Sequence, residues 1–190
     1  MNRWEPNARG RLEAAALDLY VERGFAQTTV AEIAKQAGLT ERTYFRHFAD
    51  KREVLFGGSE ELAQLIAATI ADQPESAAPI DAAAAAVEAM GDRLQPRRER
   101  AVRRQGVIAA NPELQERELT KLASMATTIA DALRERGTPS PTAGLAAETA
   151  IGVFKVAFER WTTAGTSSDL AQLIRDSFTD LKALLAEVSP

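Results

Sequence analysis

The 190-residue chain has no cysteine, a single histidine and no long uninterrupted hydrophobic run. Without cysteine it can form no disulfide bond, no thiolate metal site and no cysteine nucleophile. One histidine, His47, leaves no histidine-based catalytic triad or metal cluster. No stretch of about 18 apolar residues predicts a transmembrane helix, and the opening Met-Asn-Arg-Trp-Glu-Pro lacks the apolar segment of a signal peptide. We therefore expect a cytoplasmic protein with no cofactor, no metal site and no membrane partner.

The formal charge of −4 is unevenly distributed along the chain. Residues 1–52 carry nine Lys/Arg against seven Asp/Glu, whereas residues 53–190 carry fourteen against twenty. A mildly basic N-terminal segment attached to an acidic remainder is typical of a sequence-selective nucleic-acid binder. A nonspecific nucleic-acid coat would need a much larger positive field.

Residues 29–48 have the pattern of two short helices joined by a tight glycine turn. Thr29 and Glu32 have the spacing of a capping box at the start of the first helix. Gly38 stands where the chain needs a left-handed residue to leave that helix, and Thr40 can cap the next one. One apolar face recurs at helical period on the first helix: Val30, Ile33, Ala34 and Ala37. The pattern predicts a helix-turn-helix, whose second helix can lie in the major groove of DNA.

The second helix of this motif combines an aromatic inner side with hydrogen-bond donors around the rest. The aromatic residues are Tyr44, Phe45 and Phe48, and the donors are Arg42, Thr43, Arg46, His47 and the hydroxyl of Thr40. Arginine can bond guanine through two hydrogen bonds, and short hydroxyl side chains can reach phosphates. The alternative is a solvated amphipathic hairpin with chance charges.

The remaining sequence is helical in pattern throughout, which predicts an all-α fold of about nine helices. We expect a three-helix helix-turn-helix DNA-binding domain at residues 1–52 and a helical ligand-binding and dimerisation domain at residues 53–190. A fourth helix is expected to leave the first domain directly at Asp50 and to run to about residue 70 as a rigid lever. The last helix is expected at about residues 168–188.

The last two helices carry more apolar residues than one packing stripe requires. We interpret this excess as a dimer interface, in which each chain contributes two helices to a four-helix bundle. The candidates to meet across a two-fold axis are Phe154, Phe158, Trp161, Phe178 and Leu181. The alternative is that the protein's own core uses both faces.

An effector cavity is expected in the second domain, because only that part has the length to enclose one. The candidate lining residues are Leu62, Ile66, Met90, Leu94, Ile108, Leu122, Met125, Ile129, Phe154 and Phe158. They are apolar and include no obvious buried charge cluster, which favours a lipophilic or acyl-bearing ligand. The alternative is that they fill a solid core.

Residues 8–56 resemble the TetR family of bacterial transcriptional repressors. The residues that carry the resemblance are Gly24-Phe25, Thr28-Thr29-Val30, Ile33-Ala34, Ala37-Gly38-Leu39-Thr40, Thr43, His47-Phe48 and Asp50-Lys51. The resemblance implies a homodimer that binds a palindromic operator in double-stranded DNA and is released by a small-molecule effector.

The resemblance also implies roles for individual residues. Arg42 and Thr43 would face bases, and Arg46 bases or phosphates. Four side chains would hold phosphates: Thr29, Thr40, His47 and Lys51. Many members have Leu-Tyr where this chain has Tyr44-Phe45, so the usual phosphate-binding tyrosine is a phenylalanine here. Whether Tyr44 replaces that hydroxyl contact is left open.

The stretch from Val107 to Leu114, with Arg117 and Glu118 after it, is similar to an actinobacterial TetR subgroup. The C-terminal domain of that subgroup is described as binding acyl-CoA-like ligands. The arginines between residues 97 and 104 are candidates to meet a ligand's phosphates, or else they form a solvated helix face. These arginines are Arg97, Arg98, Arg100, Arg103 and Arg104.

Two other classes of function are considered beside a DNA-binding regulator. A helical adaptor that binds only protein would need no recognition-helix chemistry. An enzyme would need a catalytic constellation, and the sequence has no phosphate loop and no dinucleotide-binding fingerprint. We therefore expect a regulator that is not an enzyme.

Overall fold

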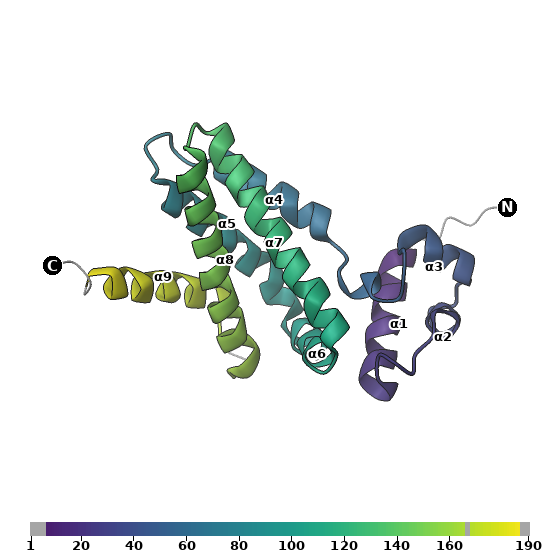
Figure 1. Ribbon diagram of the computed structural model, residues 1–190. Helices are drawn as coiled ribbons and strands as arrows, with labels where there is room; N and C mark the ends of the chain where they lie inside the picture. Colours follow the sequence, from purple (N-terminus) through teal and green to yellow (C-terminus); the bar gives the residue numbers. More distant parts are fainter. Residues whose placement is uncertain (1–6, 166–167, 187–190) are drawn as a thin grey trace. The chain divides into compact units, whose positions relative to one another are not determined.

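The computed structural model describes residues 7–165 and 168–186, and every regular element within these ranges is helical. The all-α prediction is confirmed. The elements in chain order are α1 (Ala8–Arg23), α2 (Val30–Gln36), α3 (Glu41–His47), the 3-10 turn η1 (Glu53–Leu55), α4 (Ser59–Ala71), α5 (Pro79–Leu94), the 3-10 turn η2 (Gln95–Arg97), α6 (Arg98–Ala109), α7 (Pro112–Glu135), α8 (Ser140–Thr163) and α9 (Leu170–Ala186) (Figure 1). Residues 1–6, on which the signal-peptide expectation rests, and the predicted helix end at 187–188 lie outside the described residues.

The chain divides into two compact units. The first unit comprises residues 1–57 together with 102–119, and the second comprises 58–101 together with 120–190. The first unit therefore includes the end of α6 and the start of α7 as well as the helix-turn-helix. The predicted domain boundary at residue 52 stays a prediction. The first compact unit extends to residue 57 and also includes residues 102–119.

The first unit is built on α1, which contacts α2, α3 and η1. Its core takes side chains from each of these elements and from the end of α6 and the start of α7. The contribution from α6 and α7 consists of Val107, Ile108 and Leu114. The largest fully buried side chains of this core are Leu12, Leu19, Phe25, Ile33, Tyr44 and Leu114.

Local signals in the sequence fix most of the helix ends. The Asn7 side chain accepts a hydrogen bond from Gly10 N at the start of α1. Gly24 ends α1 with φ +88°, and Gly137 follows the end of α7 with φ +86°. Both glycines have a positive φ, which favours glycine over residues with a side chain.

The predicted lever helix beginning at Asp50 is wrong. Asp50 Oδ1 accepts hydrogen bonds from Arg52 N and Glu53 N, and so it fixes the turn that leads into η1 and does not begin a long helix. The chain then turns at Gly57 and Gly58, the latter with φ +80°, and α4 begins only at Ser59. The stretch Glu53–Ala71 is long and apolar enough to span a membrane by length and composition alone. The glycine turn divides it, so it does not form one continuous helix.

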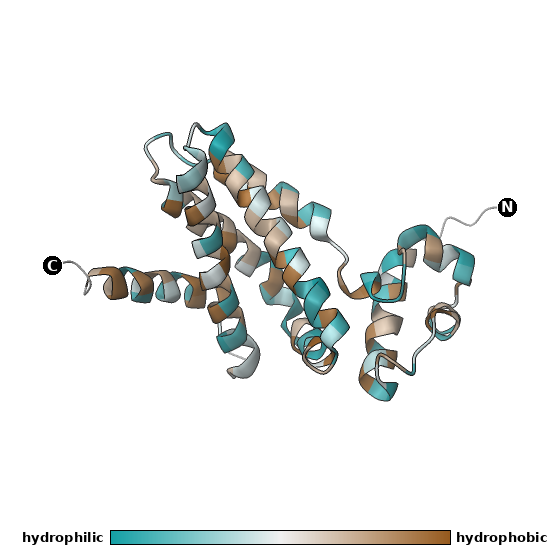
Figure 2. Ribbon diagram, viewed as in Figure 1, coloured by the Kyte–Doolittle hydropathy of each residue, from teal (hydrophilic) through white to brown (hydrophobic). Residues whose placement is uncertain are grey.

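The second unit is centred on α5, which contacts α4, α8 and α9. The apolar side of each helix contributes to one cluster, and Figure 2 shows hydrophobic and hydrophilic residues alternating along the same helices. α5 and α9 approach each other closely at Gly91, where an added Cβ would lie 3.1 Å from Ala171 N. A larger residue at this position would therefore force the two helices apart.

Candidate nucleic-acid interface

The turn between α2 and α3 is fixed by backbone hydrogen bonds and by one side chain from α1. Gly38 adopts φ +66°, and Leu39 N donates to Ala34 O at 2.8 Å, which closes the end of α2. The Arg11 guanidinium donates to Ala37 O. A Cβ at Gly38 would lie 2.8 Å from that guanidinium, so both conformation and space favour glycine here.

The predicted threonine caps are confirmed at the start of both helices of the motif. Thr29 Oγ1 accepts from Glu32 N at 3.3 Å, and the Glu32 carboxylate accepts from Thr29 N at 2.9 Å, which completes a capping box. This backbone hydrogen bond from Thr29 lowers the pKa of Glu32 below its usual value. Thr40 Oγ1 accepts from Thr43 N at 3.2 Å, and the two hydroxyl oxygens lie 3.1 Å apart. Both capping threonines are exposed, and the Thr29 hydroxyl also donates to the Glu32 carboxylate at 2.8 Å.

The inner side of α3 is anchored in the core of the first unit. Tyr44 is completely buried, its ring packs against Phe48, and its hydroxyl donates to Asp50 O at 3.0 Å. Burial raises the pKa of Tyr44 above its usual value. The sequence left open whether the Tyr44 hydroxyl contacts a phosphate, and in this structure the ring and the hydroxyl are both engaged in the interior. The anchoring fixes the rotation of α3 about its own axis.

The outer side of α3 carries two arginines and one aromatic ring. Arg42, Phe45 and Arg46 are exposed, and their spacing of three and four positions places them on one helix face. Phe45 is 54% exposed, although the adjacent Tyr44 is buried. Thr43 is half-buried beside its hydrogen-bonding partner Thr40. The helix thus presents guanidinium groups and an apolar ring on one side, held by a buried aromatic side.

His47 lies at the end of α3 and is half-buried. Its Nε2 is buried and, among the residues that the structure describes, meets no hydrogen-bond partner. Desolvation lowers the pKa of His47 below its usual value, and the positive charges of Arg46 and Arg9 lower it further. Both effects favour the neutral form of the imidazole in the unbound protein.

Lys51, which the resemblance assigns to a phosphate, is engaged within the protein. Its ammonium group donates to Phe25 O at 2.9 Å and lies 4.2 Å from the centre of the Phe25 ring. Longer hydrogen bonds of 3.5 Å reach Ala26 O and Thr28 O. Lys51 thus stabilises the turn between α1 and α2, a contact that sequence reasoning missed because nothing local connects residues 25 and 51.

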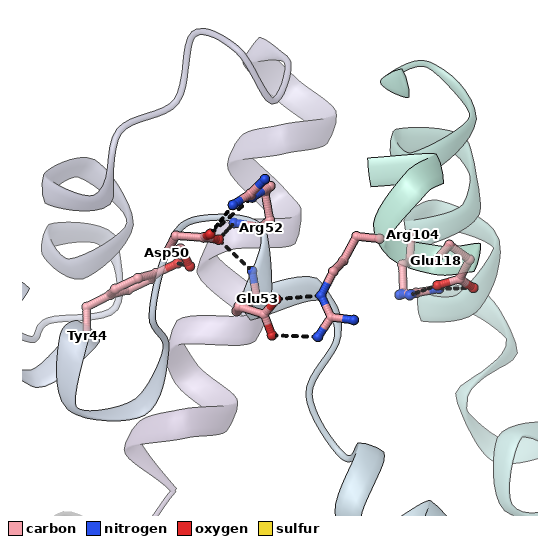
Figure 3. A network of polar contacts seen from close by, with 7 residues as sticks. Tyr44, Asp50, Arg52, Glu53, Arg104 and Glu118 are labelled. Atoms are coloured by element: carbon pink, nitrogen blue, oxygen red, sulfur yellow. Dashed lines mark hydrogen bonds and ion pairs between the residues drawn. The ribbon is translucent and has the colours of Figure 1, made fainter. Parts of the chain in front are cut away.

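A network of charged side chains joins η1 to α6 and α7 within the first unit (Figure 3). Arg117 donates to both carboxylate oxygens of Glu53, and Arg104 donates to both of Glu118 and to Leu55 O. The Phe56 ring has both guanidinium groups near it, at 4.8 Å from Arg104 and 5.3 Å from Arg117. Sequence reasoning singled out Arg104, Arg117 and Glu118 but did not predict that they hold the turn after the helix-turn-helix.

Nine of the ten residues predicted to line an effector cavity belong to the apolar cluster of the second unit. Ile66, Met90, Met125, Ile129 and Phe154 are buried in it, and Leu62, Leu94, Leu122 and Phe158 pack against it. The tenth, Ile108, is wrong as a cavity residue, because it lies in the core of the first unit. α6 belongs to the second unit up to residue 101 and to the first unit from residue 102. The spacing of apolar residues in the sequence of α6 does not show at which residue the helix passes from one unit to the other.

Three of the five arginines proposed to bind a ligand's phosphates donate hydrogen bonds to other groups of the protein. Arg98 donates to Trp161 O at 2.9 Å, and Arg103 donates to Asp18 at 2.6 Å. Arg104 holds Glu118 and Leu55 O. These three guanidinium groups therefore have structural partners within their own units.

The predicted dimer residues divide into two groups. Phe154, Trp161 and Phe178 are buried inside the protein's own core, so their assignment to a dimer interface is wrong. Phe158 and Leu181 are partly buried against the same core. The apolar residues that α8 and α9 leave exposed are Leu145, Val156, Leu184 and Leu185.

Comparison with known proteins yields two family matches in tandem. The model described as "Bacterial regulatory proteins, tetR family" matches residues 12–57, and the model described as "MftR C-terminal domain" matches residues 77–186. The mycofactocin biosynthesis transcriptional regulator MftR of Mycobacterium tuberculosis is 32% identical over 151 residues, which cover 77% of this chain and 75% of that protein.

Two solved structures share the fold at lower sequence identity. FadR from Bacillus subtilis, in complex with stearoyl-CoA, superposes with a TM-score of 0.63 at 22% identity, covering 90% of this chain and 96% of that one. FadR from Thermus thermophilus, a transcriptional repressor in complex with lauroyl-CoA, has a TM-score of 0.58 at 22% identity, covering 92% and 93%.

Proposed function

Because this chain belongs to the TetR family of bacterial transcriptional regulators, we propose that it is a homodimeric repressor released from a palindromic operator by an acyl-type effector. The proposed partners are double-stranded DNA, a second copy of the chain and a small molecule. The protein would act in the cytoplasm, where the operator is. Its matched relatives are regulators of transcription and not enzymes.

The observation that carries the proposal is the two-sided character of α3. Tyr44 and Phe48 lock one side into the core, while Arg42 and Arg46 stand exposed on the other. A helix whose rotation is fixed can present the same donors to the same base edges in every complex, which sequence-selective binding requires. Thr29, Thr40 and Thr43 lie at or near helix N-termini, where hydroxyl and backbone donors suit phosphate oxygens.

Dimerisation is supported by the exposed apolar side chains of α8 and α9. Leu145 and Val156 are exposed on α8, and Gly152 between them has open space around it within the protein. Leu184 and Leu185 extend the exposed apolar surface on α9. Covering these side chains with a second copy would remove them from water, and a two-fold axis would place two α3 helices about 34–36 Å apart.

An acyl-CoA effector is supported by two structural neighbours and by the chemistry of the second unit. The cluster that contains Ile66, Met90 and Phe154 is apolar, which suits an acyl chain. The two structural neighbours described above hold stearoyl-CoA and lauroyl-CoA. The effector can release DNA only by binding more tightly to the conformation that does not bind the operator.

We place the route of this coupling in α6 and α7 rather than in α4. Both helices begin or end in the first unit and continue into the second, whereas the chain enters α4 through two glycines. Glu53 and Arg117 tie the start of α7 to the turn that follows the helix-turn-helix. Arg117→Ala is expected to weaken effector-induced release while leaving effector binding intact.

The test begins with selection of bound duplexes from a random DNA pool, followed by gel retardation at fixed salt. Arg42→Ala should cost about 1–3 kcal/mol and relax preference at one base position. Arg97→Ala is the matched control, an exposed arginine outside α3, and should bind as the wild type does. Lauroyl-CoA, stearoyl-CoA and the matched free fatty acids are then titrated against the complex. If no duplex is selected, the proposed sequence-selective DNA binding is refuted. If no acyl compound releases the DNA, the proposed acyl-type effector is refuted.

A further inference from the structure

Phe45 is an exposed aromatic residue on the face of α3 that carries Arg42 and Arg46. The core of the first unit is completed by other aromatic residues, namely Tyr20, Phe25, Tyr44, Phe48 and Phe56. Phe45 makes an edge contact with Tyr44, with ring centres 5.6 Å apart, and 54% of its surface stays open. Packing within the protein therefore does not explain a ring at this position.

The position of the ring on the helix defines what it can touch in a complex with DNA. Arg42, Phe45 and Arg46 are related by three and four positions and form one continuous stripe. If the guanidinium groups of this stripe reach base edges, the ring beside them lies on the same helix face, at its edge, and can contact a neighbouring base edge. Phe45 has no hydrogen-bond donor, so it cannot replace a hydroxyl contact to a phosphate.

The major-groove edge of B-DNA offers one apolar group to such a ring, the C5-methyl group of thymine. We infer that Phe45 is a specificity-determining residue that reads thymine through this methyl group, next to the base pairs contacted by Arg42 and Arg46. The inference rests on the proposed function, because it requires α3 to enter the major groove. Contact with the ring removes both the methyl group and part of the benzyl side chain from water, which favours thymine over every base without that methyl group.

The test uses the duplex selected from the random pool by the wild-type protein. Thymines in the two half-sites are replaced symmetrically, one position at a time, by deoxyuridine, which lacks only the methyl group. The wild type should bind one of these duplexes about tenfold to twentyfold more weakly, which corresponds to about fourfold for one buried methyl group in each of the two half-sites. Phe45→Ala should bind the thymine and uracil versions of that duplex equally.

Two controls separate this contact from general effects of substitution. Val21→Ala removes a similarly exposed apolar side chain from α1, where Val21 is 50% exposed, and should keep the full preference for thymine. Circular dichroism and thermal melting should show that Phe45→Ala folds as the wild type does, because the ring lies outside the core.

Several results would overturn the inference. One is a wild-type protein that is insensitive to uracil at every position, and another is a selected half-site without thymine. A third is that wild type and Phe45→Ala lose the same affinity when thymine is replaced by uracil. A fourth is that Phe45→Ala binds the thymine and uracil duplexes more weakly than wild type by the same factor, which would assign the ring to the sugar-phosphate backbone instead. These results leave DNA binding intact and so differ from a pool selection that yields no duplex, which would refute the proposed function itself.

Discussion

Glu53 and Arg117 form a two-pronged ion pair although 64 positions separate them in the chain. Arg117 Nε lies 2.6 Å from one carboxylate oxygen of Glu53, and its terminal nitrogen lies 3.0 Å from the other. This hydrogen bonding raises the pKa of Arg117. The pair fixes η1, which directly follows the helix-turn-helix, to the beginning of α7 inside the first unit.

Arg117→Ala is expected to lower the free energy of unfolding by about 1 kcal/mol. The geometry is that of a strong bidentate pair, but both side chains are about one-third exposed, which limits the gain. Urea denaturation of Arg117→Ala, Glu53→Ala and the double variant measures the coupling between them. Arg134→Ala is the matched control, since its pair with Asp131 is more exposed. A coupling energy of zero would show that the pair contributes nothing to stability.

Gly91→Ala is expected to destabilise the second unit by about 1–3 kcal/mol, the usual cost of overpacking a filled core. The new Cβ would lie 3.0 Å from the end of Ile174 and 3.1–3.2 Å from backbone atoms of Ala171, which cannot move away as a side-chain end can. Gly106→Ala is the control within α6, where an added Cβ meets nothing within 4 Å. That substitution should stabilise the protein by up to about 1 kcal/mol, because alanine favours helix over glycine. Equal melting temperatures for the two variants would contradict the close approach of α5 and α9.

Val156→Glu and Leu145→Glu are expected to convert the proposed dimer to monomer without unfolding it. Both side chains are exposed on α8, so a charge there disturbs a partner and not the core. Val21→Glu is the control on α1 and should remain dimeric. Light scattering at micromolar concentration gives the mass, and circular dichroism reports the fold. A wild-type protein that is a folded monomer under these conditions would refute the dimer.

Helix ends and the helix-turn-helix were predictable from the sequence because their signals are local. Thr29 with Glu32, Thr40, Gly24 and Gly38 each act within a few residues, and each adopts the predicted role. The turn at Gly57 and Gly58 also had a local signal, but the capping residue Asp50 suggested a helix that starts eight residues too early.

Which side of a helix is buried and which is exposed was not predictable in the same way. α8 is apolar on more than one side, and helical period alone does not separate the side packed on α5 from the side left exposed. The large residues Phe154 and Trp161 fill the core, while the smaller Val156 is exposed. Adjacent aromatic residues on α3 pose the same ambiguity, because Tyr44 is buried and Phe45 is not. Contacts between distant residues, such as that of Lys51 with Phe25, leave no mark in the sequence.

Lys51→Ala is expected to reduce both stability and the salt dependence of DNA binding. Loss of the ammonium contacts to Phe25 should lower the free energy of unfolding by about 1–2 kcal/mol. The phosphate contact implied by the family remains a prediction, because two of the three carbonyl contacts of Lys51 are long at 3.5 Å and could be exchanged for a phosphate oxygen. Its loss should reduce the salt slope by about 0.9. Lys35→Ala, an exposed lysine on α2, is the control for stability. An unchanged slope with reduced stability would make Lys51 a structural residue only.

His47 is expected to give stability and DNA affinity opposite dependences on pH. Its pKa in the free folded protein lies below the value of about 6.5 expected in the unfolded chain, because desolvation and the charges of Arg46 and Arg9 oppose protonation. Below pH 6.5 the unfolded chain therefore binds more protons than the folded protein. The contribution of His47 to stability is complete above pH 6.5, is lost as the pH falls, and becomes constant below the folded pKa.

DNA reverses this preference if His47 donates to a phosphate, because a nearby negative charge favours the imidazolium form. Operator affinity should then rise as the pH falls from 7.5 to 5.5, whereas the free protein is destabilised below pH 6.5. His47→Gln removes the titrating group, so the difference between wild type and variant isolates its contribution in both measurements. We expect the stability difference in favour of the wild type to shrink as the pH falls, and the affinity difference to grow. Parallel affinity curves for the two proteins would exclude a protonated His47 from the DNA contact and leave the imidazole as a neutral packing group at the end of α3.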